Sequence, residues 1–147
     1  MPIQIDTARS KFEVVDDSHL TLNEAVENDK KNLKSHFLVN VGTNALRYGK
    51  NVIHYTFELT EHAVGIRYDS NLCNIPSDEV ADHKEKIIEK YKEMELGRLI
   101  IKEYPTGSCT VQMIRNHIEK LTLKNFTPSL IIIDYADIMR SSNATIV

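Results

Sequence analysis

Two acidic residues stand at the ends of apolar stretches in positions where they could act on a bound ligand. Glu58 follows "VIHYTF" and Asp134 follows "LIII", and both stretches predict buried strands. Ligands of open α/β sheets bind beyond the carboxyl ends of the strands. One carboxylate there can hold Mg²⁺, often through water, and another can activate an attacking water. Each acid alone could simply mark where a strand emerges into solvent; together, in this order, they favour a nucleotide site.

The elements needed to position these acids alternate along the chain. Strands are expected over 51–58, 98–103 and 130–134, and helices over 35–48, 60–73, 78–96 and 110–122. The last strand is apolar throughout, which is typical of a parallel sheet covered on both faces. The pattern predicts an α/β fold with a mostly parallel sheet and helices on both faces. Six side chains are expected to be buried: Ile53, Tyr55, Phe57, Ile100, Ile131 and Ile133.

The first third of the chain allows two arrangements. Thr21 and Glu24 form a capping-box pattern that opens a helix, and neither proline nor glycine follows before Gly42. This helix therefore either fuses with the helix at 35–48 or is joined to it by a short polar connection over 28–32. Residues 1–33 are expected to form a partly helical extension, with strand character before residue 17, and 141–147 a weakly patterned tail.

Composition narrows the functional classes. The chain has 147 residues, and 41% of them are hydrophobic, which suits one domain with a core. Its net charge of -3 gives no electrostatic reason for strong nucleic-acid binding by the isolated chain. Cys73 and Cys109 lack metal-ligand spacing. His54 and Glu58 would share a face only on a helix, and their segment is a predicted strand. The longest apolar run, 130–133, is too short to cross a membrane.

Three stretches carry a family resemblance. They are "KSHFLVNVGTNALRYGKNVIHYTFEL", "LGRLIIKEYPTG" and "LTLKNFTPSLIIIDYADIM". From Lys34 to about Met139 the chain resembles the RecA-like ATPase domain of DnaB-type phage replicative DNA helicases, most closely the T-even branch. The resemblance implies a partial RecA-like helicase core of P-loop NTPase type over 34–140. It also implies a cytoplasmic phage protein in a bacterial host.

The resemblance also assigns roles to four residues. Glu58 would be the catalytic base, and Asp134 the Walker B acid. Lys34 and Ser35 would be the last two residues of Walker A, where the lysine neutralises phosphate charge. Ser35 and Asp134 would hold Mg²⁺ if a nucleotide binds. Mg-ATP is the cofactor of the intact family.

The phosphate-binding loop itself is missing from the sequence. Walker A requires G-x-x-x-x-G-K-[ST], because glycines let backbone N–H groups surround the phosphates. Leu33 stands where the last glycine should be, and Gly42 is the first glycine in the chain. We therefore expect no cofactor in this chain alone, with Lys34 facing solvent and Ser35 capping a helix. Glu58 and Asp134 are then expected to repel a nucleotide as uncompensated carboxylates, unless Mg²⁺ lies between them and the phosphates.

Three functional hypotheses follow. The first is a truncated or degenerate helicase ATPase domain, related by ancestry to DNA unwinding but unable to bind or hydrolyse ATP alone, since further ATPase elements and an N-terminal domain of the family are not seen. The second is a non-enzymatic protein that pairs with itself or with an intact helicase subunit. The third is an enzyme that has rebuilt the loop. DNA is expected as a partner only through the full family assembly, and a membrane is not. Loss of a strand exposes a sheet edge, which we expect residues 1–17 or another copy of the chain to cover.

Overall fold

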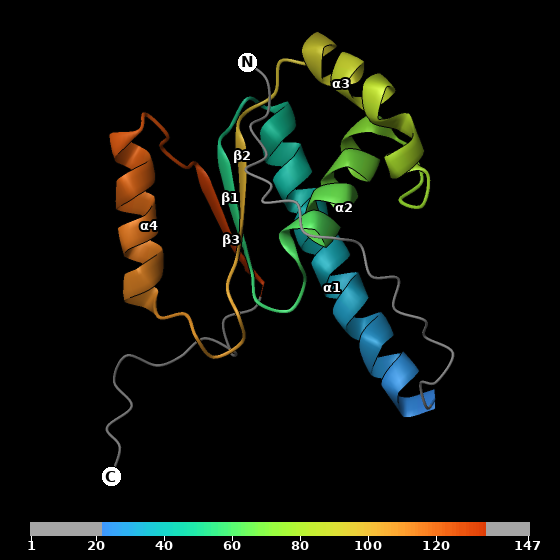
Figure 1. The fold of residues 1–147 in the computed structure, drawn as a ribbon, viewed down its shortest axis with the longest axis horizontal. Helices are drawn as coiled ribbons and strands as arrows, with labels where there is room; N and C mark the ends of the chain where they lie inside the picture. Colours follow the sequence, from blue (N-terminus) through green and yellow to red (C-terminus); the bar gives the residue numbers. More distant parts are fainter. Residues whose placement is uncertain (1–21, 135–147) are drawn as a thin grey trace.

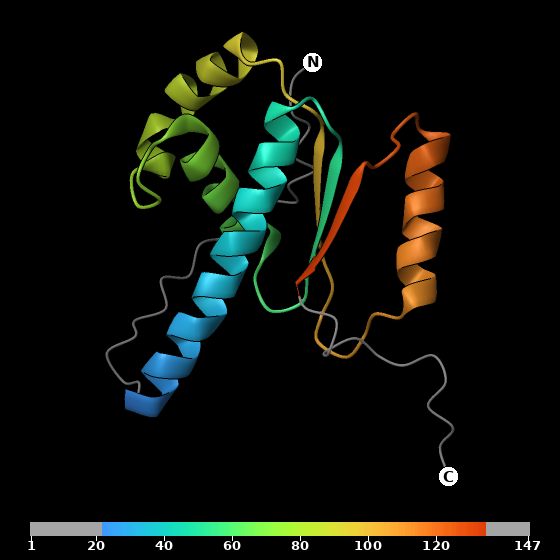
Figure 2. The same cartoon turned by 180° about the vertical axis from the view of Figure 1, so that it is seen from behind.

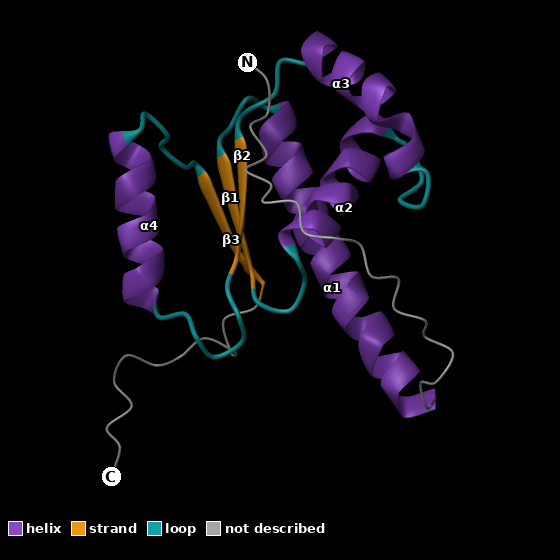
Figure 3. Cartoon of the chain, in the orientation of Figure 1, coloured by secondary structure: helices purple, strands orange, loops and turns teal. Residues whose placement is uncertain are grey.

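A small parallel sheet lies between one helix on one face and three helices on the other. The computed structural model describes the backbone of residues 22–134 and the side chains of residues 33–134. Strands β1 (Val52–Thr56), β2 (Leu99–Glu103) and β3 (Leu130–Asp134) are arranged in the order β2-β1-β3, and both pairs are parallel. Figure 1 shows this layered arrangement along the chain, and Figure 3 separates helices from strands. The predicted α/β fold with a parallel sheet is confirmed.

The helices differ in which face of the sheet they cover. Helix α4 (Val111–Leu123) lies alone on one face, while α1 (Leu22–Arg47), α2 (Glu61–Cys73) and α3 (Lys84–Glu93) lie on the other. A short 3₁₀ helix, η2 (Val80–His83), precedes α3 directly. The single helix expected over 78–96 is therefore wrong in detail, because the chain first forms a tight 3₁₀ turn and ends its helix at Glu93.

Local chemistry accounts for where the helices begin and end. Thr60 accepts a hydrogen bond from the backbone N–H of Ala63 at 3.1 Å, and Thr110 accepts one from Met113 at 3.3 Å. These are N-caps of α2 and α4, which satisfy an otherwise unpaired N–H in the first turn. Gly49 has φ +72 just after α1, a left-handed conformation that glycine adopts without strain.

Helix α1 resolves the two arrangements that the sequence left open. It runs without interruption from Leu22 to Arg47. The helix expected over 35–48 is thus the second half of a longer one, and its backbone has no break at the expected boundary between residues 33 and 34. The strands expected before residue 17 and the tail at 141–147 lie outside the described residues.

Two hydrophobic clusters fill the spaces on either side of the sheet. The larger lies under α1, α2 and α3 and includes Val52, Leu99 and Ile132. The smaller lies under α4 and includes Ile53, Tyr55 and Phe57, which are buried as expected. Cys73 belongs to the first cluster and Cys109 to the second, so the sheet separates these two free thiols.

The expected burial of the sheet is wrong at one position and incomplete at two. Ile131 is 43% exposed, and Ile100 and Ile133 are half-buried. All three side chains point to the face that carries only α4, and β3 forms the edge of the sheet. An apolar edge strand covered by a single helix keeps part of its surface open, which a run of four apolar residues cannot reveal.

Candidate functional site

Asp134 is the centre of the candidate site. It ends β3 and pairs in register with Thr56, the last residue of β1, so the carboxyl ends of both strands meet at one edge of the sheet. The backbone N–H of Phe57 donates to the carbonyl of Asp134 at 3.1 Å and extends this pairing by one residue. Although it carries a charge, the Asp134 side chain is 6% exposed. A carboxylate this deeply buried needs partners, because desolvating an unpaired charge is costly.

Helix α1 supplies those partners from the residues expected to be Walker A remnants. Ser35 Oγ donates a hydrogen bond to Asp134 Oδ2 at 2.7 Å, and Lys34 Nζ lies 3.4 Å from Asp134 Oδ1. We call this arrangement of Lys34, Ser35 and Asp134 the latch. The Ser35 bond is buried, with Ser35 8% exposed, whereas the Lys34 side chain is 46% exposed. The latch joins both oxygens of the carboxylate to a single helix.

The structure corrects the expectations for Ser35 and Asp134 and adds a contact to the one for Lys34. Lys34 is exposed, as expected, but its ammonium group also forms an ion pair with Asp134. Ser35 does not cap a helix, because it lies inside α1, about three and a half turns after Leu22. Nor is Asp134 an uncompensated carboxylate, since a hydroxyl and an ammonium group bind it.

The other expected acid occupies a different environment. Glu58 lies two residues beyond the end of β1, in a bend, and its side chain is exposed. The strand register brings the chain at Glu58 to the same edge of the sheet as Asp134. The structure thus places the two acids at neighbouring strand ends, one exposed and the other bound within the latch.

A buried histidine lies behind the latch. His54 stands on β1, on the same face as Thr56, and is 1% exposed. Its Nδ1 and the Tyr68 hydroxyl are 2.8 Å apart, and Nε2 has no hydrogen-bond partner among residues 33–134. Burial, opposed by the negative charge of Asp134 and assisted by the positive charge of Arg67, lowers the pKa of His54 to about 4. His54 is therefore neutral near pH 7.

Arg67, on α2, belongs to the same electrostatic environment. Burial lowers the pKa of its guanidinium, and the negative charge of Asp134 opposes that shift. Burial also lowers the pKa of His36, and the charge of Arg67 adds to the effect. The Asp134 carboxylate is thus influenced by cations from two helices, Lys34 on α1 and Arg67 on α2.

Sequence reasoning missed His54 and Arg67. His54 was weighed only as a metal ligand beside Glu58, although a histidine within a β-branched and aromatic strand also signals a buried hydrogen bond. Gly42 was a second signal, since a Cβ at this position of α1 would lie 2.2 Å from the Tyr68 hydroxyl oxygen. The missing side chain lets Tyr68 pass between α1 and the sheet to reach His54.

The residues around Asp134 do not fit Mg-ATP. Binding of phosphates at a Walker A motif depends on unpaired backbone N–H groups. Beyond the first turn of a helix these groups bond to carbonyls four residues earlier, and Lys34 and Ser35 both lie in that region of α1. The expected Mg²⁺ ligands, Ser35 and Asp134, are bonded to each other. Within residues 33–134, moreover, no three His, Cys, Asp or Glu side chains are grouped as a metal site.

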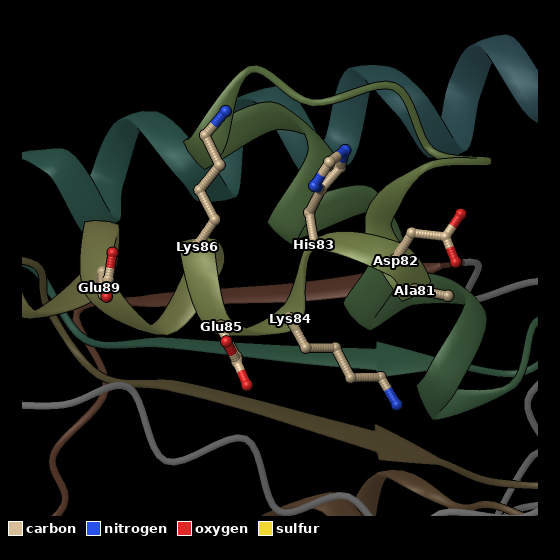
Figure 4. Close-up of a pocket in the computed structure, with 7 residues that line it drawn as sticks. All are labelled: Ala81, Asp82, His83, Lys84, Glu85, Lys86 and Glu89. Carbon is tan, nitrogen blue, oxygen red and sulfur yellow. The ribbon is translucent and has the colours of Figure 1, made fainter.

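A shallow hollow elsewhere has no comparable chemistry. It is formed by one continuous stretch, residues 81–89, where η2 meets α3. Figure 4 shows that its side chains diverge, with Lys86 and His83 on one side and Lys84 and Glu85 on the other. Because charges of both signs point outwards and none converge, we place the candidate site at Asp134.

Comparison with known proteins relates the chain to a phage helicase. No family model matches the sequence. The DnaB-like replicative helicase of Enterobacteria phage T4 is 36% identical over 117 residues, which cover 74% of this chain and 24% of the helicase. The chain thus spans about a quarter of the length of this relative. None of the described helices is both long and apolar enough to span a membrane. The chain is related to the DnaB-like replicative helicases and corresponds to part of a DnaB-type helicase domain with an incomplete RecA-like core.

Proposed function

We propose that this chain is a degenerate helicase ATPase domain that neither binds nor hydrolyses ATP by itself. Its relative's description as a replicative helicase supports a connection to DNA replication. The observation that carries the proposal is the latch, in which Ser35 and Lys34 bind the carboxylate that would otherwise serve Mg²⁺. The proposal places the chain in the cytoplasm of an infected bacterium.

The proposed inactivity has a physical reason, because interactions within the chain would have to break before Mg-ATP could bind. To admit Mg²⁺, Asp134 must give up a charge-assisted hydrogen bond, which contributes about 1.5–3 kcal/mol. A triphosphate would also need backbone N–H donors, which α1 uses for its own helical bonds. Unwinding part of α1 to provide them would cost further helical bonds. Nothing in residues 33–134 offers a replacement phosphate cradle.

Calorimetric titration of the full chain with Mg-ATP tests this proposal. We expect no saturable heat and no DNA-stimulated phosphate release, while an intact DnaB-type helicase gives both under the same conditions. Stoichiometric micromolar binding that Lys34→Ala abolishes would contradict the proposal. Lys92→Ala is the matched control, since it removes an exposed lysine on α3, away from the latch.

A second function, as a non-enzymatic partner of an intact helicase subunit or of itself, is favoured by the open edge of the sheet. β3 has a neighbour on one side only among the described residues, and Ile131 is 43% exposed. Addition of the chain to an intact DnaB-type helicase, followed by DNA unwinding and native mass spectrometry, tests this function. An unchanged unwinding rate with no mixed species would exclude the heterologous version.

A further inference from the structure

Among the residues that the structure describes, the outer edge of β3 has no neighbouring strand, and the strand itself lacks the features that normally protect an edge. Natural edges are blunted by charges, prolines or bulges, because unpaired N–H and C=O groups invite another strand. The opposite edge, β2, carries Lys102 and Glu103 within the strand. Strand β3 has no charge before its last residue, no proline, and an unbroken register with β1. The β3 edge is thus suited to pairing.

A second surface, on α1, borders this edge. Four residues follow the alternating three- and four-residue spacing by which two helices pack together: Leu38, Val41, Ala45 and Tyr48. The first three are half-buried, and Tyr48 is 83% exposed. We call this set the α1 seam. Side chains at such a spacing insert between the side chains of a facing helix.

The position of the α1 seam follows from what the other sides of the helix contact. Val39 and Leu46 face the sheet and are buried. Asn40 and Arg47 face α2, where both bind Asn71. The seam is therefore on the side away from α2, above β3. Figure 2 agrees, since α1 passes in front of α2 and β3 passes in front of β1.

The α1 seam is complementary to itself when two copies run in opposite directions. Pairing about Val41 brings Val41 against Val41 of the second copy and Leu38 against Ala45, a large residue against a small one. It also brings Lys34 near Tyr48 of the second copy, an arrangement that favours a cation–π contact. Running the helices in the same direction would instead place Tyr48 against Tyr48 and Ala45 against Ala45, leaving one layer crowded and another empty.

The β3 edge has its own centre of symmetry. Antiparallel pairing about Ile132 would match Ile131 with Ile133 of the second copy. These residues lie on the face that α4 covers incompletely, so pairing would bury Ile131, which is 43% exposed in the single chain. The sheet would then continue from one copy into the other as six strands.

The two centres of symmetry, Val41 on α1 and Ile132 on β3, lie at nearly the same height along the strand direction. The contact between Ser35 and Asp134 gives a common reference level, and α1 runs opposite to the strands. Val41 is six residues from Ser35, about 9 Å along a helix. Ile132 is two residues from Asp134, about 7 Å along a strand. A single two-fold axis can therefore relate both surfaces.

The lateral spacing agrees as well. Because α1 contacts both β3 and β1, its axis lies above the space between them. With strands about 4.8 Å apart, a two-fold axis beside β3 would separate the two α1 helices by about 10 Å. Packed helices are separated by about 8–10 Å. Strand pairing and helix packing thus require the same dimer.

We propose that this chain forms a two-fold symmetric homodimer in which β3 pairs antiparallel with β3 of the second copy while the two α1 seams pack against each other. The proposal deepens the self-pairing version of the second function. It does not depend on whether the chain binds nucleotide, so its failure would leave the proposed inactivity untouched.

Light scattering and analytical ultracentrifugation of the full chain test the dimer. We expect a mass twice that of the 16.8 kDa chain. Val41→Glu would place two carboxylates face to face at the two-fold axis, and we expect the dimer to dissociate at least about 100-fold more readily. Ile88→Glu is the matched control, because Ile88 is 54% exposed on α3, and it should leave the dimer intact.

A charge-reversed pair keeps the test decisive if one variant is destabilised. Val41→Lys should also dissociate the dimer, and mixing it with Val41→Glu should restore a dimer containing one copy of each. Val41→Cys should form a disulfide-linked dimer on mild oxidation, unlike Ile88→Cys. A monomer at every concentration, a dimer that withstands Val41→Glu, or a mixture that remains monomeric would overturn the proposal.

Discussion

The latch makes Ser35 a stabilising residue without any nucleotide. In Ser35→Ala, Asp134 Oδ2 loses its 2.7 Å hydrogen-bond donor while remaining 6% exposed. Hydrogen bonds to charged groups contribute about 1.5–3 kcal/mol, and a buried acceptor left without a donor incurs its desolvation cost. We therefore expect Ser35→Ala to lower the free energy of unfolding by about 2 kcal/mol.

Lys34 gives the contrasting half of this prediction. Its ammonium lies 3.4 Å from Asp134 Oδ1, but its side chain is 46% exposed. Solvent screens such a pair, so Lys34→Ala should cost about 0–1 kcal/mol. The ranking of the two variants thus follows from burial rather than from formal charge. A nucleotide-binding role would instead make Lys34→Ala the more damaging of the two variants, since a Walker A lysine acts on phosphate as a charge.

Urea unfolding monitored by circular dichroism measures both effects. In a double-mutant cycle, Ser35→Ala combined with Asp134→Asn should show a coupling of about 0.5–3 kcal/mol, because the two residues form one contact. Ser108→Ala is a matched control, since Ser108 is exposed and bonds only to the nearby Pro105 carbonyl. A Ser35→Ala cost no larger than that of the control, or strict additivity with Asp134→Asn, would refute the reasoning.

The remaining predictions concern the buried network behind the latch and the glycines. His54 has a pKa of about 4 in the fold and near 6.5 when unfolded; the unfolded chain binds more protons between these values. Stability should thus fall by about 3 kcal/mol as pH decreases from 6.5 towards 4, an effect that urea titrations should find reduced in His54→Gln. Gly42→Ala should cost about 1–3 kcal/mol, because its Cβ displaces Tyr68, measured as a lower Tm. Gly65→Ala is the control, since its nearest neighbour would be 3.9 Å away; it should raise the Tm by removing a helical glycine.

The parts of the fold that sequence predicted well depend on local chemistry. Thr60 and Thr110 cap helices through contacts three residues away, and Gly49 supplies a left-handed turn. The strands and their parallel direction followed from apolar runs separated by helices. Such features need only neighbouring residues and general packing rules, so one sequence is sufficient to identify them.

The features that were missed depend on position in space. Ile131 resembles its neighbours in sequence, and its exposure follows only from β3 being the edge and from α4 covering that face alone. Ser35 and Asp134 are 99 residues apart in the chain. The family resemblance grouped them as Mg²⁺ ligands, but their direct contact needs the direction of α1, its angular phase and the strand order together. Both acids were placed at the correct strand ends, but their surroundings were not predictable.

The continuity of α1 places the two residues that resemble the end of a Walker A motif in the interior of a helix. Because no glycine precedes Gly42, nothing interrupts the helix at residue 34, and it carries Lys34 and Ser35 to the end of β3. The buried Asp134 still requires a donor there, since an unpaired carboxylate would cost more than a paired one. The same three residue types that would bind Mg-ATP in the family thus satisfy one another. Their presence in this chain therefore supports kinship with the helicases, and their contacts contribute to stability; on our proposal these contacts take the place of nucleotide binding.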